Sequence, residues 1–156
     1  MANTYSQIYI QIVFAVMGRQ HFIKESFREE LHKYMTGIII NKKQKLYAIY
    51  CMPDHAHLFV SMKPDISIAE LTRDVKSNSS SFLKERKLVP ETFSWQSGYG
   101  AFSYSKSQAP DVVNYILNQP QHHQKKTFRE EYLEFLEKFG IDYDPKYLFE
   151  FYDSEL

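Results

Sequence analysis

The segment from residue 51 to residue 62 constrains the fold of this chain more than any other. Pro53 and Asp54 predict a turn, and the residues after them alternate with the two-residue period of a β-strand. One face of that strand is apolar and predicts a side packed on the core. The other face carries His55, His57, Phe59 and Ser61. Two imidazoles side by side on one strand face can supply two ligands to a metal ion.

Periodicity along the first two thirds of the chain predicts the elements around this histidine strand. Alternation indicates strands, and apolar residues three and four apart indicate helices. The short link before the histidine strand favours an antiparallel hairpin. The predicted order is a strand over residues 5–16, a helix over 24–42, a strand over 46–52, the histidine strand, a helix over 67–84 and a short strand near 101–105.

This order predicts an α+β fold, a ferredoxin-like split βαβ sandwich in which an antiparallel sheet carries its helices on one face. The other face of such a sheet is open, and the alternation places both histidines on it. Two more helices are expected after this core: one begins at Pro110 and Asp111 and is disturbed by Pro120, and one begins at the Thr127 capping box. We expect a single domain over residues 1–156, with the core at about 1–106 and the additional C-terminal helices and tail at about 107–156.

Composition excludes several classes of protein. The chain has 19 basic and 19 acidic side chains, so it lacks the bulk positive charge of a non-specific nucleic-acid binder. The charge is uneven, with 14 basic against 9 acidic residues over residues 1–110 and 5 against 10 over residues 111–156. A basic body is compatible with an anionic ligand, although such runs are more often solvated faces. The lone Cys51, the absence of a long apolar run and the absence of a secretory leader predict a cytoplasmic protein without a membrane span.

A helix that carries Tyr115 could complete a site with the histidines. Tyr115 and Gln119 are four residues apart, so they lie on one helix face. The amide oxygen of Gln119 can be a third metal ligand, and a metal would polarise a phosphate for attack by the Tyr115 phenol. With 12 Tyr and 12 Phe in the chain, Tyr115 can equally be one more packed aromatic. His122 and His123 diverge by about 100° on a helix, so we expect at most one of them at this site, as an outer or DNA-contacting group. Capping at the surface is the more usual role for such a pair.

The combination of these motifs resembles the single-tyrosine HUH transposases of small insertion sequences and their domesticated relatives that act on repeated palindromes. The resemblance covers nearly the whole chain. It rests on Tyr5-Ser-Gln-Ile-Tyr-Ile-Gln-Ile-Val-Phe14, Met52-Pro-Asp-His-Ala-His-Leu-Phe59, Trp95-Gln-Ser-Gly-Tyr99, Tyr115-Ile-Leu-Asn-Gln-Pro-Gln-His-His123 with Phe128 and Glu131, and the tail Phe139-Gly-Ile-Asp-Tyr-Asp-Pro-Lys-Tyr-Leu148.

The resemblance implies a metal-dependent transposase that acts on single-stranded DNA. His55 and His57 would be the HUH pair, Gln119 the third ligand to Mg²⁺ or Mn²⁺, and Tyr115 the nucleophile. Tyr115 would attack a phosphate at the foot of a DNA hairpin and leave a 5′-phosphotyrosine and a free 3′-hydroxyl for strand transfer. The resemblance also implies a bacterial homodimer, associated with the nucleoid when on DNA, in which the histidines of one subunit can act with the tyrosine helix of the other.

Three alternatives stay open at this point. The chain can be a domesticated repeat-palindrome endonuclease with the same chemistry. It can be a non-catalytic single-strand binder that stacks bases on Tyr9 and Phe59 of an open sheet. It can also be a metal hydrolase with a third histidine and water as the nucleophile. The residues predicted to contact DNA are Tyr9, Lys76 and His123. Lys76 lies in the unusually polar middle of its helix, and the alternative interpretation of that polar stretch is a face exposed to solvent.

Overall fold

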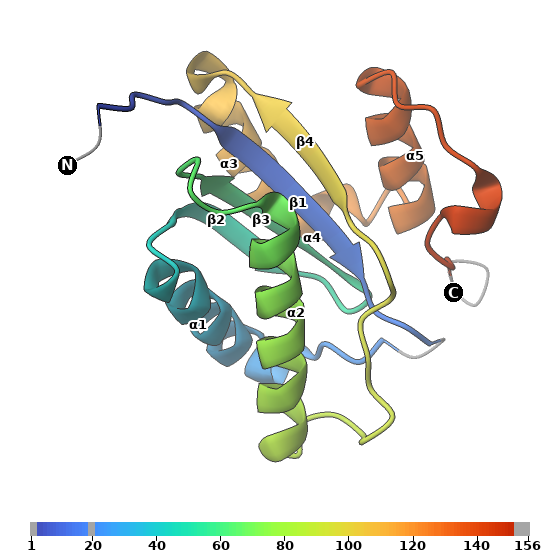
Figure 1. The fold of residues 1–156 in the computed structure, drawn as a ribbon. Helices are drawn as coiled ribbons and strands as arrows, with labels where there is room; N and C mark the ends of the chain where they lie inside the picture. Colours follow the sequence, from blue (N-terminus) through green and yellow to red (C-terminus); the bar gives the residue numbers. More distant parts are fainter. Residues whose placement is uncertain (1–2, 19–20, 152–156) are drawn as a thin grey trace.

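The computed structural model describes residues 3–18 and 21–151 (Figure 1). The final five residues of the predicted acidic tail lie outside the described part. The elements in chain order are β1 (Tyr9–Ala15), α1 (Glu25–Asn41), β2 (Lys45–Cys51), β3 (His55–Ser61), α2 (Ile68–Glu85), β4 (Gly100–Tyr104), the 3-10 turn η1 (Lys106–Gln108), α3 (Ala109–Leu117), α4 (Gln119–His122), α5 (Phe128–Lys138) and the 3-10 turn η2 (Pro145–Tyr147). The predicted strand–helix–strand–strand–helix–strand order is confirmed.

The four strands form one antiparallel sheet in the order β2-β3-β1-β4. The histidine strand β3 is therefore interior, flanked by β2 and β1. Its register with β1 places His57 opposite Val13 and His55 opposite Ala15. The tight turn between β2 and β3 makes the predicted hairpin, with an irregularity between Leu46 and Ala48 of β2.

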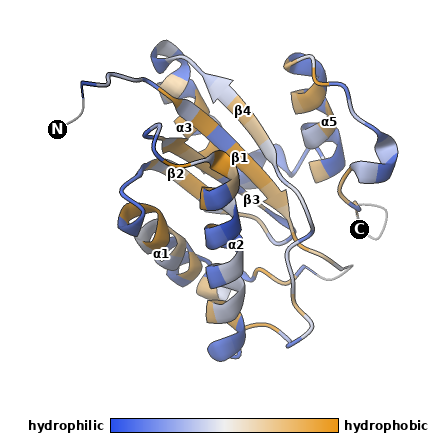
Figure 2. Cartoon of the chain, in the orientation of Figure 1, coloured by the Kyte–Doolittle hydropathy of each residue, from blue (hydrophilic) through white to orange (hydrophobic). Residues whose placement is uncertain are grey.

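Helices α1 and α2 pack on one face of the sheet, as the sequence predicts (Figure 1). Figure 2 shows hydrophobic colour along most of β1 and extensive hydrophilic colour on the side of α2 that faces away from the sheet. The principal core on this face includes these fully buried residues: Ile12, Phe14, Leu31, Met35, Ile39, Leu58, Leu71 and Leu83.

The second face of the sheet is not open, and the expectation of an uncovered face is wrong. Helix α3 packs against β2 and β3 on that side, and α5 lies beside β4 (Figure 1). A second apolar cluster forms beneath α3, with Tyr9 and Phe59 of the sheet packed against Val112 and Ile116 of the helix. The polar side of β1 is buried as well, since Gln11 is 0% exposed. The histidines therefore lie between two layers.

In the described residues, none of the helices is both long enough and apolar enough to cross a bilayer.

Candidate metal centre

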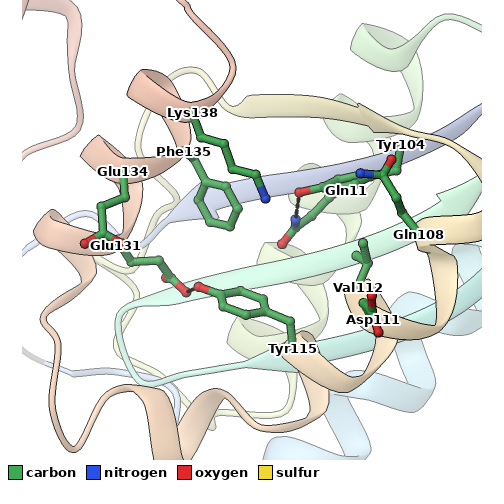
Figure 3. A pocket seen from close by; sticks show the side chains of 10 residues that line it. All are labelled: Gln11, Tyr104, Gln108, Asp111, Val112, Tyr115, Glu131, Glu134, Phe135 and Lys138. Atoms are coloured by element: carbon green, nitrogen blue, oxygen red, sulfur yellow. Dashed lines mark hydrogen bonds between the residues drawn. The ribbon is translucent and has the colours of Figure 1, made fainter.

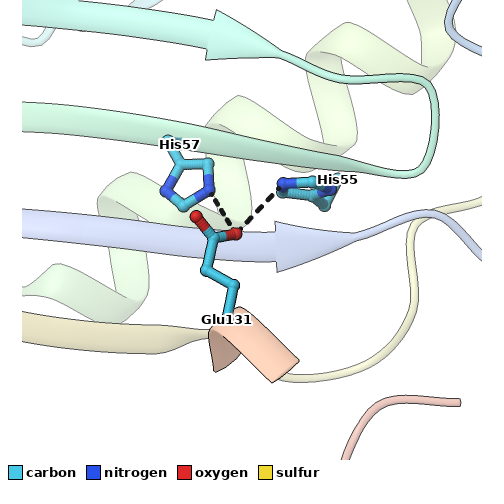
Figure 4. A group of neighbouring side chains, drawn as sticks. All are labelled: His55, His57 and Glu131. Carbon is cyan, nitrogen blue, oxygen red and sulfur yellow. Dashed lines mark hydrogen bonds and ion pairs between the residues drawn. The ribbon is translucent and has the colours of Figure 1, made fainter. Parts of the chain in front are cut away.

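Three buried side chains converge between the sheet and the C-terminal helices. His55 and His57 come from β3, and Glu131 comes from the first turns of α5 (Figure 4). One ligand atom from each lies within 4.8 Å of the other two. Glu131 Oε1 is 3.4 Å from His55 Nε2 and 3.1 Å from His57 Nε2. Within the described ranges this is the one such group, and it has the size and donor types of a metal site.

Each imidazole is oriented by an acceptor behind it. Asp54 Oδ1 is 2.7 Å from His55 Nδ1, and Gln11 Oε1 is 2.7 Å from His57 Nδ1. An acceptor at Nδ1 fixes the proton there and leaves Nε2 for a metal. Both Nε2 atoms face the shared centre near Glu131. The hydrogen bonds that would orient both imidazoles toward a metal ion are therefore already in place.

Burial and neighbouring opposite charges have opposing effects on the pKa values of His55, His57 and Glu131. Burial acts to lower the pKa of His55, but the carboxylates of Asp54 and Glu131 raise it to about 10. Burial lowers the pKa of His57, and Glu131 only partly opposes that effect. Burial acts to raise the pKa of Glu131, but the neighbouring imidazoles hold it well below its usual value. Without a metal, an ionised Glu131 carboxylate thus sits beside a protonated His55, and a bound cation would take over the role of that proton.

Gln119 reaches the same centre from a different helix than expected. The sequence predicts Tyr115 and Gln119 on one continuous helix face, but α3 ends at Leu117 and α4 begins at Gln119. Pro120 explains the break, because its nitrogen cannot donate to the carbonyl of Ile116 and its ring disfavours a continuous helix. Gln119 is nevertheless 0% exposed. Its Oε1 is 3.2 Å from His55 Nε2, and its Nε2 donates to Glu131 Oε2 over 2.8 Å.

The Tyr115 side chain borders the centre. Its hydroxyl donates a hydrogen bond to the Glu131 carboxylate, and its ring lies edge-on to His57 with centroids 6.2 Å apart. Burial, followed by the adjacent Glu131 charge, raises the pKa of the Tyr115 phenol. The phenol is therefore held protonated, with its oxygen at the edge of the metal-binding group.

Both His122 and His123 lie at this site, contrary to the expectation that only one would. The His122 ring stacks on the ring of Tyr115 with centroids 4.5 Å apart. His123 Nε2 lies 3.0 Å from Gln119 Oε1 and 3.1 Å from Glu131 Oε1. The two side chains do diverge, but Tyr115 and Glu131 surround the end of α4, so each histidine meets a different part of the site.

Glu131 is the site residue that sequence reasoning missed as a ligand. It was visible only as part of the family-like motif. A physical signal existed, because Phe128, Tyr132 and Phe135 form the buried stripe of α5 and Glu131 falls within it. A carboxylate on the buried stripe of a helix needs a positive partner.

Two predicted DNA contacts are engaged within the fold. Tyr9 is 8% exposed and packs with Phe59 in the cluster beneath α3. The ammonium group of Lys76 donates to the backbone carbonyls of Gln96 and Gly98, over 2.7 and 2.9 Å. Lys76 thus ties the loop before β4 to α2. Of the three predicted contacts, only His123 adjoins the candidate centre.

The donor set suits a divalent cation. Two imidazole nitrogens, a carboxylate and an amide oxygen converge, and none of these side chains is more than 2% exposed. Mixed nitrogen and oxygen ligands are typical of sites for first-row divalent metals. The residues present therefore fit a metal ion, and the phenol of Tyr115 lies beside them.

Comparisons with known proteins agree with this fold. The family described as "Transposase IS200 like" matches residues 4–119. A solved structure described as a "putative transposase" from Deinococcus radiodurans R1 superposes with a TM-score of 0.58 at 19% identity, over 76% of this chain and 95% of that one. A structure described as a REP-associated tyrosine transposase bound to a REP hairpin superposes with a TM-score of 0.60 at 13% identity, over 79% of this chain and 73% of that one. No curated protein matches at a significant level. At these identities the two structures show a shared fold, and Glu131 lies beyond the span of the family match.

Proposed function

The chain belongs to the IS200-like transposase family, and on that premise we propose that it cuts and rejoins single-stranded DNA with Tyr115 as a covalent nucleophile. One observation carries the proposal. The hydroxyl of Tyr115 is hydrogen-bonded to Glu131, and Glu131 is itself a member of the group that converges with His55 and His57. The nucleophile and the candidate metal ligands thus meet within a single chain.

We propose that His55, His57, Gln119 and Glu131 hold Mg²⁺ or Mn²⁺. Two imidazoles favour manganese over magnesium and do not exclude zinc. When bound, such a cation polarises a phosphoryl oxygen and stabilises the charge that develops in the transition state. Asp54 and Gln11 keep the two imidazoles turned toward it.

The chain's own residues then perform the transfer. Glu131 accepts the hydrogen bond of the Tyr115 hydroxyl and so positions it, and the phenol proton passes to water as the phenol oxygen attacks. The phenol oxygen attacks the phosphorus, the bond to the 3′-oxygen breaks, and that oxygen takes up a proton from water to become a 3′-hydroxyl. The product is a 5′-phosphotyrosine at Tyr115. Because the phosphoester is conserved, a 3′-hydroxyl can later attack it and restore a DNA strand without an energy source.

We propose a single-stranded DNA hairpin as the substrate, supported by the similar fold of a protein described as bound to a REP hairpin. The same likeness supports a second candidate, a domesticated nuclease that acts on repeated palindromes with identical chemistry. We also propose a homodimer, as the family resemblance implies. The burial of Tyr9 and Phe59 argues against a binder that stacks bases on an open sheet.

The test is a covalent adduct. Labelled hairpin oligonucleotides that carry the palindromes near the gene are incubated with the protein and Mn²⁺ and then separated on a denaturing gel. We expect a protein–DNA adduct that disappears when the metal is chelated or when Tyr115 is replaced by Phe. Tyr143→Phe, a change at a half-exposed tyrosine away from the site, is the matched control and should leave the adduct intact. Cleavage to a free 5′-phosphate without an adduct would instead support a hydrolase that uses water, with His123 beside Glu131 as its third histidine.

A further inference from the structure

A cavity of about 350 Å³ opens beside the nucleophile (Figure 3). It lies between β4, α3 and α5, and both Tyr115 and Glu131 line it. We propose that this cavity is a nucleobase pocket, which receives the base of one of the two nucleotides that flank the scissile phosphate. The proposal rests on the proposed function for the identity of the strand, but the binding of a nucleobase can be measured without any cleavage.

The size and the walls of the cavity fit a single nucleotide. Its volume is at the low end of the range of about 300–1,000 Å³ found for small-molecule sites, which is too small for several stacked nucleotides. Aromatic side chains from three elements line it: Tyr104 from β4, Tyr115 from α3 and Phe135 from α5. Bases removed from a stack are commonly held against such rings.

Charge decides which part of a nucleotide can enter. Asp111, Glu131 and Glu134 are three carboxylates in the lining, and Lys138 is the one cation among the lining residues. This balance repels a phosphate, which would need a positive pocket. It accepts a neutral base whose N–H groups can donate to carboxylates and whose ring acceptors can receive from Lys138.

The polar groups of the cavity are fixed rather than free to adapt. Gln11 Nε2 is 3.0 Å from the Tyr104 hydroxyl, and Gln11 Oε1 is 2.7 Å from His57 Nδ1. Gln11 therefore both lines the cavity and orients the His57 ring. The side chain of Lys138 extends across the cavity toward Gln11 (Figure 3). A base bound in the cavity would therefore contact the fixed amide of Gln11 and the ammonium group of Lys138.

The position of the cavity selects a base next to the cut. The Tyr115 hydroxyl and Glu131 lie at its border, so a phosphate attacked by Tyr115 brings an attached nucleoside to its mouth. The nucleosides bonded to that phosphate are the ones held nearest to the cavity. The occupant is therefore a base that adjoins that phosphate.

The experiment measures the binding of small probes by isothermal titration calorimetry. The probes are dAMP, dCMP, dGMP and dTMP, with 2-deoxyribose 5-phosphate as the probe that lacks a base. We expect at least one nucleotide to bind about tenfold more tightly than the sugar phosphate, as a single stacking contact predicts. Asp111→Trp fills the cavity from its exposed rim and should abolish that preference, and Gln108→Trp provides a second filling variant should the first fail to fold. Glu137→Trp, on α5 but outside the lining, is the matched control and should retain it.

Equal affinity for all five probes, no binding of any nucleotide, or an unchanged preference in a folded filling variant would overturn the proposal. Its failure is distinguishable from that of the proposed function. A base preference without a Tyr115 adduct on hairpin DNA would contradict the proposed chemistry but support the pocket. An adduct without a base preference would do the reverse.

Discussion

Asp54 and Gln11 determine how the two histidines can act, although neither belongs to the converging group. Each accepts from the Nδ1 side of one imidazole and so turns the Nε2 lone pair toward the centre. A residue of this kind affects a metal through the ligand it orients. The pair thus explains why a strand with two histidines can become a site when most such strands do not.

Replacement of Asp54 by Asn should weaken metal binding without unfolding the protein. The amide keeps the shape but loses the charge that makes His55 basic, and changes of this type lower metal affinity by about 10–100-fold. Titration with Mn²⁺, followed by the electron paramagnetic resonance signal of the free ion, measures the affinity. Asp65→Asn, at an exposed residue before α2, should leave it unchanged. Equal Mn²⁺ affinity in Asp54→Asn and the parent protein would contradict the assigned role.

The metal-free protein should lose stability as the pH rises from about 6.5 to about 10. Burial acts against the charge of His55, but Asp54 and Glu131 raise its folded-state pKa to about 10, above the ordinary 6.5. The protonated imidazole therefore stabilises the fold fully below pH 6.5, and that contribution is lost as the pH passes through the folded-state pKa. We expect the melting temperature of chelator-treated protein to fall over this window, and to fall less in Asp54→Asn. Parallel pH curves for the two proteins would show that His55 does not carry the effect.

Helix α5 supplies Glu131, and its N-terminal cap holds that residue in place. The Thr127 side chain accepts from Glu130 N, and Glu130 reaches back to Thr127 in a reciprocal capping box. Glu131 follows at the next position. The sequence predicts this cap correctly, because the motif is local and requires no knowledge of the tertiary structure.

Thr127→Ala should therefore affect metal binding, whereas the equivalent change in α2 should not. Loss of an N-cap destabilises a protein by about 1 kcal/mol. Ser67 caps α2 through the same type of bond, to Glu70 N, on the far side of the sheet. We expect similar losses in urea denaturation for Thr127→Ala and Ser67→Ala, with weaker Mn²⁺ binding only in the former. An equal Mn²⁺ affinity in the two variants would mean that the first turn of α5 does not position Glu131.

Local patterns predicted individual elements well but could not place the C-terminal helices. The alternation of β3 correctly separated the histidine side from the core side, and Pro120 correctly marked a disturbance. Gln119 remains in the site despite the helix break at Asn118. Periodicity could not predict this placement, because the direction of the chain after the break depends on the backbone angles of Asn118. The buried carboxylate of Glu131 was missed because its partners are 74 and 76 positions away in sequence.

In the whole molecule, the candidate site lies between two layers that come from different parts of the chain. The strands come from the first 104 residues, and α3 to α5 come from the remainder. The sequence places Tyr9 on an open sheet face, yet α3 covers it, and Gln11 on the polar side of the same strand is 0% exposed. Their burial is a tertiary effect, so it became visible only in the structure.

A metal that joins β3 to α4 and α5 should stabilise the folded chain as a unit. Binding to the native state at 100 times the dissociation constant contributes about 2.7 kcal/mol. For a chain of this size, that corresponds to a rise in melting temperature of about 5–11 °C. Differential scanning fluorimetry with Mn²⁺ should detect the rise in the parent protein and not in His57→Ala. An identical shift in that variant would place the ion elsewhere.

The most direct measurement is the chemical identity of the residue that carries DNA. The adduct formed with a labelled hairpin and Mn²⁺ is digested with nuclease and protease, and the peptides are sequenced by mass spectrometry. The chain has 12 tyrosines, several of them more exposed than Tyr115, so the outcome discriminates strongly. The expected result is a nucleotide joined through its 5′-phosphate to Tyr115 alone. This adduct should be absent when His55 or His57 is replaced by Ala. Modification of a different tyrosine, or an adduct that persists without the histidines, would contradict the assignment of a metal-assisted tyrosine nucleophile.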